Sequence, residues 1–351
     1  MRAVAGTALE RRFGGCGMAG ARRALTGLVM AGALCLIPAP AAQATGPGEN
    51  GRIAFSAARG MNPSWNGSLF SVNPDGTGEA PITYTAESVS DERPAWSPDG
   101  RKIAFVRMVY DNYISCCVVT EDIVIATASG AVQRVLTGTH RVNGAEPWFS
   151  RGGREGWGTL TWSPDGRRIA YGGGGGNSGQ PQIWVINADD SGLPVRVSDG
   201  TQWEISPAWS PDGSRIALQR NGHLFTMSPT GADVRPVGDG LTGDALPDWS
   251  PDGRRLATVR TEGGSSGIAI IDANTGATLI RLASGLQQSP VWSPDGTRVA
   301  YVQPEASAPG DPETSNVYTI DAQGAGPAVR VTSRPVTGQT LNLTPTWQPR
   351  R

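Results

Sequence analysis

The chain has 351 residues, of which 38% are hydrophobic and 17% charged, a composition typical of a globular protein. Its 48 glycines and 27 prolines suit many tight turns and argue against long helices. Two histidines are too few for chemistry that needs clustered imidazoles, and a net charge of −1 without a basic stripe does not indicate nucleic acid as a partner.

The first 44 residues have the pattern of an export signal. A pair of arginines precedes an apolar run over 24–37, which is too short to span a membrane, and small residues end at Ala44. We therefore predict a signal peptide over 1–44, cleaved after Ala44, and a periplasmic, cell-envelope or extracellular mature chain without a transmembrane span. A retained N-terminal anchor is the alternative, and Met18 is a second candidate for the initiator.

Beyond the signal peptide the only cysteines are Cys116 and Cys117. A trans peptide holds neighbouring Cα atoms about 3.8 Å apart, below the usual disulfide range of about 4.4 to 6.8 Å. We expect two unlinked thiols, with a strained vicinal disulfide as the alternative. The fold should not depend on disulfides.

A repeat organises the rest of the chain. Trp-Ser-Pro-Asp-Gly occurs five times without a change, and each copy is followed, after two further residues, by a short apolar run. A sixth copy is divided between the two ends, because Pro345-Thr346-Trp347 has no apolar run after it and Ile53-Ala54-Phe55 has no tryptophan before it. The marker tryptophans are Trp96, Trp162, Trp209, Trp249, Trp292 and Trp347.

Between successive markers an alternating strand, a turn and a second short strand recur. Each unit thus supplies four strands and no helix. The alternating strands cover 68–72, 122–126, 182–186, 223–227, 267–271 and 316–320, and the short strands cover 80–82, 132–136, 194–197, 234–237, 277–282 and 328–331.

Four short antiparallel strands in each of six units are the layout of a β-propeller. The divided copy predicts how the ring closes, with the strand that ends at Trp347 innermost in the blade that begins near Arg52. This pairing leaves no open edge between the first and last blades. We therefore predict an all-β fold, a six-bladed propeller of four-stranded antiparallel blades over 51–351, after a short leader over 45–50.

The motif itself is predicted to be structural. Ser, Pro, Asp and Gly fit the four positions of a type I turn, which would join the innermost strand of each blade to the next strand. The preceding tryptophan is a large flat side chain that suits packing between neighbouring blades. The motif aspartates lie on five separate blades, so they do not form a catalytic site.

The repeat Pro-x-Trp-Ser-Pro-Asp-Gly-x-x-Ile-Ala-Phe resembles the WD40-like propeller repeat of TolB and related bacterial propellers, and the resemblance covers 51–349. It implies the fold more than the function, because the family includes the Tol-system periplasmic protein, propeller domains of prolyl-oligopeptidase-type and tricorn-type proteases, and oligogalacturonate lyases. The sequence shows no α/β domain before the propeller and no peptidase domain after it. The lyases of the family look like metal enzymes with histidine ligands, and two histidines are too few for such a site. The resemblance therefore implies a stand-alone exported propeller.

Strand direction assigns the connections to two faces. The motif turns and other short turns share one face, and the long insertions share the other, at 109–121, 138–157, 172–181, 199–205, 304–315 and 333–342. Loops on a rigid scaffold carry function, so we expect a binding site on the long-loop face. Its candidate partner-binding residues are Tyr110, Tyr113, Trp148, Phe149, Arg151, Arg154 and Trp203, since exposed aromatics and arginines are typical interface anchors. The alternative is that these aromatics only fix their loops to the propeller.

The position five residues before each marker tryptophan is predicted to lie at the mouth of the central channel. These residues are Asp91, Trp157, Glu204, Asp244, Gln287 and Asn342. With three carboxylates, this ring could bind a cation or a cationic side chain. The alternative is that these residues are solvated loop ends.

The first functional hypothesis is an exported, non-catalytic and monomeric scaffold that binds a protein or cell-envelope partner through the long-loop face. We predict no catalytic residue, no cofactor and no metal for it. The second is an enzyme or ligand-binding protein that acts on a glycan or small metabolite at the channel mouth, where Asp91, Glu204 and Asp244 would be its acid–base candidates.

Overall fold

The computed structural model divides the chain into two units, Met1–Pro40 and Ala41–Arg351. It describes residues 48–58, 67–110, 118–136, 159–174, 180–238, 243–285, 287–305, 314–332, 336–337 and 344–350, all within the second unit. The predicted signal peptide and both cysteines of the mature chain lie outside these ranges. The described residues form strands and turns, and none of them belongs to a helix that could cross a membrane.

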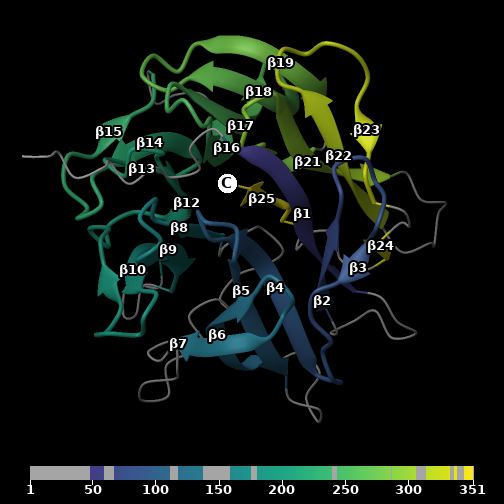
Figure 1. Ribbon diagram of the computed structural model, residues 1–351. Coiled ribbons are helices and arrows are strands. Elements are labelled where there is room, and N and C mark those ends of the chain that lie inside the picture. Colours follow the sequence, from purple (N-terminus) through teal and green to yellow (C-terminus); the bar gives the residue numbers. More distant parts are fainter. Residues whose placement is uncertain are drawn as a thin grey trace, which may run out of the picture. The chain divides into compact units, whose positions relative to one another are not determined.

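The strands form six sheets that surround a common centre (Figure 1), which confirms the predicted blade number. Blade 1 consists of β25 (Thr346–Arg350), β1 (Glu49–Ala58), β2 (Gly67–Val72) and β3 (Ala80–Pro81). Blade 2 consists of β4 (Val89–Trp96), β5 (Lys102–Tyr110), β6 (Val118–Thr127) and β7 (Val132–Leu136). Blade 3 consists of β8 (Leu160–Trp162), β9 (Arg168–Gly173), β10 (Gln182–Asn187) and β11 (Val195–Arg196).

The other three blades follow the same order from the innermost strand outwards. Blade 4 consists of β12 (Glu204–Trp209), β13 (Ile216–Arg220), β14 (His223–Met227) and β15 (Arg235–Pro236). Blade 5 consists of β16 (Gly243–Trp249), β17 (Arg255–Glu262), β18 (Ser265–Asp272) and β19 (Thr278–Ser284). Blade 6 consists of β20 (Gln288–Trp292), β21 (Arg298–Glu305), β22 (Thr314–Asp321) and β23 (Val329–Arg330), and β24 (Val336–Thr337) also pairs with β22.

The two ends of the described chain meet in blade 1, as the divided repeat predicts. β25 runs antiparallel to β1, with Trp347 opposite Ile53. Side chains of the same two strands also reach both neighbouring blades. Gln348 donates a hydrogen bond to the carbonyl of Gly100 in blade 2 (2.8 Å), and Asn50 donates to Asp295 in blade 6 (2.8 Å). Blade 1 therefore closes the ring through backbone and side-chain contacts.

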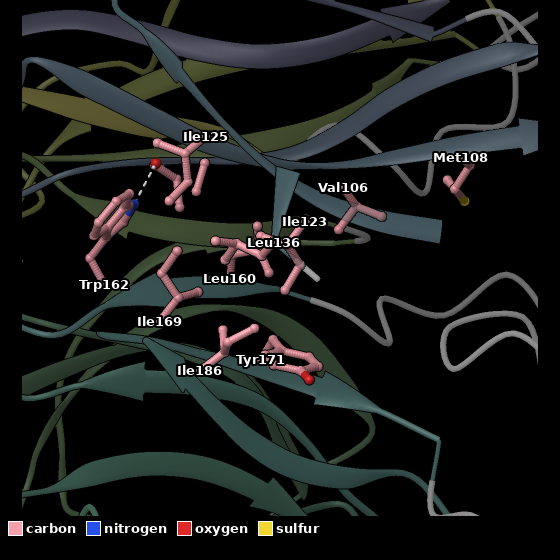
Figure 2. Packing of buried hydrophobic residues seen from close by; sticks show 12 residues of the cluster. Val106, Met108, Ile123, Ile125, Leu136, Leu160, Trp162, Ile169, Tyr171 and Ile186 are labelled. Atoms are coloured by element: carbon pink, nitrogen blue, oxygen red, sulfur yellow. Dashed lines mark hydrogen bonds between the residues drawn. The ribbon is translucent and has the colours of Figure 1, made fainter. Parts of the chain in front are cut away.

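The hydrophobic core consists of six clusters, one between each pair of neighbouring blades. Each cluster contains one marker tryptophan, and these side chains are only 4% to 9% exposed. Figure 2 shows the cluster between blades 2 and 3, where the indole of Trp162 donates a hydrogen bond to the carbonyl of Ala95 (3.0 Å). The predicted position of the marker tryptophans between blades is confirmed.

The motif turns have the predicted hydrogen bonds. In all five copies the glycine N–H donates to the serine carbonyl at 2.8 to 2.9 Å, and the glycine has a positive φ of 66° to 72°. The serine hydroxyl donates to the aspartate at 2.5 to 2.6 Å. Partial burial alone would raise the pKa of Asp99, but hydrogen bonds from Ser97 and the backbone of Arg101 outweigh it, so the pKa is lowered. The motif aspartates are turn residues.

Candidate functional site

A cavity of about 170 Å³ lies at the centre of the propeller and is lined by the innermost segment of all six blades. Each blade contributes the stretch from three residues before its marker tryptophan to the tryptophan itself. Four of the motif prolines also line it, namely Pro98, Pro211, Pro251 and Pro294. The cavity therefore reaches the face of the motif turns, where the sequence did not lead us to expect a site.

The residue three positions before each marker tryptophan forms a ring around this cavity, which we call the channel ring. Its members are Arg93, Thr159, Ser206, Leu246, Ser289 and Thr344. In four blades this residue lies at a β-bulge and has a positive φ, at Arg93 (56°), Ser206 (54°), Leu246 (54°) and Ser289 (51°). A bulge changes the direction of one side chain relative to a regular strand. The same irregularity therefore recurs where the blades meet the cavity.

Three hydroxyl groups of the channel ring are buried and have no hydrogen-bond partner within the described part of the chain. They are Oγ1 of Thr159, Oγ of Ser206 and Oγ1 of Thr344. Ser206 is only 1% exposed. A buried polar group without a partner costs about 1 to 3 kcal/mol, so three of them at one cavity call for a partner that the described residues do not supply.

The residue just before the marker tryptophan alternates around the ring. In blades 1, 3 and 5 it is polar and accepts a hydrogen bond from the backbone N–H of the next blade's marker tryptophan. The pairs are Thr346 with Trp96 (3.5 Å), Thr161 with Trp209 (3.3 Å) and Asp248 with Trp292 (2.7 Å). In blades 2, 4 and 6 the residue before the marker tryptophan is apolar, namely Ala95, Ala208 or Val291. The backbone carbonyls of Ala95 and Ala208 accept hydrogen bonds from the indole N–H groups of Trp162 and Trp249. Polar and apolar residues therefore alternate around the channel wall, although the motif that follows them is identical in five blades.

Asp248 is the acidic residue among those that line the cavity. Its surroundings raise the pKa of its carboxyl to about 7, because burial disfavours the charged form more than the N–H groups of Trp292 and Trp249 favour it. The side chain is half-buried, since the cavity lies beside it. Its protonation therefore changes near neutral pH, where Thr161 and Thr346 at the equivalent positions have no charge.

The predicted channel-mouth carboxylates are buried and paired with arginine. Each lies on an innermost strand opposite an arginine of the next strand. Asp91 pairs with Arg107 (2.7 Å), Glu204 with Arg220 (3.2 Å) and Asp244 with Arg260 (2.6 Å). Gln287 is also buried, and it donates to the carbonyl of Ser284 (2.9 Å).

None of these four residues lines the cavity, and Trp157 and Asn342 lie outside the described residues. Within the described ranges, no group of three or more His, Cys, Asp or Glu residues could hold a metal ion. The cation site stays a prediction, and the arginine pairing gives the three carboxylates a structural role. The spacing of sixteen residues from each carboxylate to its arginine is a signal in the sequence that would have revealed these pairs.

Of the predicted partner-binding residues, the structure describes two. Tyr110 is the last residue of β5. Trp203 is half-buried just before β12, and its backbone exchanges hydrogen bonds with Asn221 at 3.0 and 3.2 Å. Tyr113, Trp148, Phe149, Arg151 and Arg154 lie outside the described residues. The structure therefore does not test whether these side chains come together.

Comparisons with known proteins agree on the fold. No family model matches the chain. TolB from Acinetobacter baumannii is 21% identical with a TM-score of 0.62, over 86% of this chain and 67% of that one. A putative TolB from Agrobacterium tumefaciens is 16% identical with a TM-score of 0.57, over 86% of this chain and 99% of that one.

A curated relative matches a smaller part. Dipeptidyl-peptidase 5 from Porphyromonas endodontalis is 32% identical over 88 residues, which are 23% of this chain and 13% of the peptidase. The chain therefore has the six-bladed propeller fold of the TolB proteins, and these identities show no more than the fold.

Proposed function

We propose that this protein is an exported, non-catalytic propeller that binds a protein or cell-envelope partner on its long-loop face. Export rests on the predicted signal peptide, and the TolB-like fold supports a scaffold of this kind. The proposal is mainly supported by a contrast between the two faces of the propeller.

The motif face is built from short turns whose polar groups bond to one another. Besides the five motif turns, it carries the turns after the third strand of each blade, such as Asn73–Gly78, where the backbone and the side-chain amide of Asn73 both donate hydrogen bonds to Thr77. Successive motif turns also touch, since a Cβ on Gly213 would lie 3.1 Å from Pro164 of the preceding blade. The serine, aspartate and backbone groups of these turns are therefore engaged largely within the turns themselves.

The opposite face is where the longer connections join the strands. β1 ends there at Ala58 and β5 at Tyr110, and the next strands begin at Gly67 and Val118. The longest connection runs from β7, which ends at Leu136, to β8. It carries four of the predicted partner-binding residues. Long loops on a rigid scaffold are where binding residues are usually found.

The test replaces residues 138–157 with a short Gly-Ser linker in the otherwise complete protein. A matched control inserts Gly-Ser residues after Asp190, in an exposed turn of the motif face. Both variants should keep the melting temperature of the wild type, because neither change removes a described member of an interblade cluster. Cross-linking in isolated cell envelopes, followed by mass spectrometry, should show about tenfold fewer cross-linked partners for the replacement and no loss for the control.

Partners that are unaffected by the replacement would contradict the proposal. Turnover of any polysaccharide or ester in a substrate panel would favour the enzyme alternative at the channel mouth. The panel is best run on the wild type and the replacement together, because the alternative places its chemistry on the same face.

A further inference from the structure

The central cavity has the features of a ligand site that is separate from the long-loop face. Its polar groups come from the channel ring, where Ser206 is almost completely buried and its hydroxyl is without a partner in the described structure. The hydroxyls of Thr159 and Thr344, on two other blades, are also buried and have no partner among the described residues. Hydroxyls from three blades thus line one cavity with hydrogens to donate.

Two of the described residues that line the cavity are charged, Arg93 and Asp248. Arg93 belongs to the channel ring, at the same level as the three hydroxyls, and its guanidinium carries a positive charge and hydrogen-bond donors. Asp248 lies two residues further along its strand than Leu246, the ring member of blade 5. The channel ring therefore combines a positive charge with hydrogen-bond donors, and the single carboxyl lies towards the motif turns.

Most of the other described residues that line the cavity are apolar, with Thr161, Thr346 and Ser293 as the polar exceptions. The residue that follows the channel ring is proline in five blades and Leu160 in blade 3. The five prolines are Pro94, Pro207, Pro247, Pro290 and Pro345. Rings of proline and the indoles of the marker tryptophans would accommodate a short hydrocarbon chain. They would offer nothing to a second charged group.

We propose that the central channel binds a small monocarboxylate, whose oxygens accept hydrogen bonds from Arg93, Ser206, Thr159 and Thr344. Hydrogen bonds between an ionised acceptor and such donors are the stronger kind, and a guanidinium matches the planar carboxylate. A cavity of about 170 Å³ has room for a short acid and little more. A multiply charged anion fits less well, because Arg93 is the only arginine among the described lining residues and Asp248 would repel the anion.

The experiment uses the full mature protein and titrates it with propionate in a calorimeter. Propionamide, which has the same shape without the charge, is the matched ligand control. Six tryptophans line the cavity, so intrinsic fluorescence provides an independent readout. We expect saturable binding of one propionate per chain with a change in tryptophan emission, and no binding of propionamide.

Two substitutions locate the site. Ser206→Ala should weaken propionate binding about tenfold, and Arg93→Gln should weaken it more, because each removes a donor to the carboxylate. Arg101→Gln, at an exposed arginine that does not line the cavity, is the matched control and should bind like the wild type. If Arg93→Gln fails to fold, propionate binding by the smaller Ser206→Ala variant decides whether the site is in the channel.

Absence of saturable binding at millimolar carboxylate, or binding that neither substitution weakens, would overturn the proposal. Tighter binding of inorganic phosphate than of any short monocarboxylate would overturn the assignment of ligand class. None of these outcomes bears on the partner-binding face, which the replacement of residues 138–157 tests separately.

Discussion

The motif turns and the residues just before them differ sharply, although they are adjacent in every blade. The turns are identical in sequence in five blades, and their serines and aspartates are satisfied by hydrogen bonds within the turn. The channel ring, three residues before each tryptophan, holds arginine, leucine, serine or threonine, and three of its buried hydroxyls have no partner among the described residues. The turns repeat without change, whereas the channel ring differs from blade to blade.

This difference separates residues that build the propeller from residues that would give it specificity for a ligand. A residue that must be the same in every blade serves the geometry of the blade. A residue that varies within an otherwise fixed frame is not bound by that requirement, so its side chain can serve another role. The channel ring, rather than the most visible motif, is therefore where a ligand would distinguish this propeller from another.

The largest expected effect concerns a marker tryptophan of the repeat. Trp162→Ala should lower the free energy of unfolding by roughly 3 to 5 kcal/mol, because it opens a cavity between blades 2 and 3 and removes the hydrogen bond to Ala95. Urea denaturation followed by circular dichroism measures it. Trp203→Ala, at a half-buried tryptophan outside the six clusters, is the control and should cost much less. Similar losses for the two variants would contradict a structural role for the motif tryptophans.

The next effect concerns Asp248 in the variable channel wall. Because burial raises the pKa of its carboxyl to about 7, the folded state holds this proton to a higher pH than the unfolded state, whose pKa is near 3.8. The contribution of Asp248 to stability is therefore greatest below the unfolded pKa and declines as pH rises from about 4 to about 7. We expect a decline of roughly 2 kcal/mol, less than the full shift implies, since water in the cavity can screen the charge.

Asp248→Thr isolates this contribution, because threonine occupies the equivalent positions 161 and 346 and accepts the same hydrogen bond there. The other carboxylates are common to both proteins and cancel in the comparison. The variant should gain stability relative to the wild type as pH increases from 4 to 8, in denaturation curves measured at each pH. A stability difference that does not vary with pH would show that Asp248 titrates normally.

The fold could be predicted from the sequence because its signal repeats. Five intact motifs and one divided copy specify both the number of blades and the pairing of Trp347 with Ile53, and each copy supports the others. The turn hydrogen bonds were also predictable, since they involve residues within five positions of one another.

The site was harder to predict because its parts do not repeat. Ser206 and Thr344 face one cavity from blades that are far apart in sequence, and no local pattern marks either residue. The sequence predicts a channel-mouth cation site at Asp91 and Asp244, and it does not predict their ion pairs, because each partner arginine lies sixteen residues away on the next strand. A polar residue in one strand is interpretable only once its cross-strand neighbour is known.

The most direct test of the contrast between the two regions is one substitution made in each. Ser163 in a motif turn and Ser206 in the channel ring are 0% and 1% exposed, so removing either hydroxyl alters a buried side chain. Ser163→Ala should lower the free energy of unfolding by roughly 1 to 2 kcal/mol, because Asp165 and the N–H of Arg168 lose their partner. Ser206→Ala, measured without ligand, should be neutral or stabilising, because it removes a hydroxyl that has no partner. Equal destabilisation by the two substitutions would contradict the account.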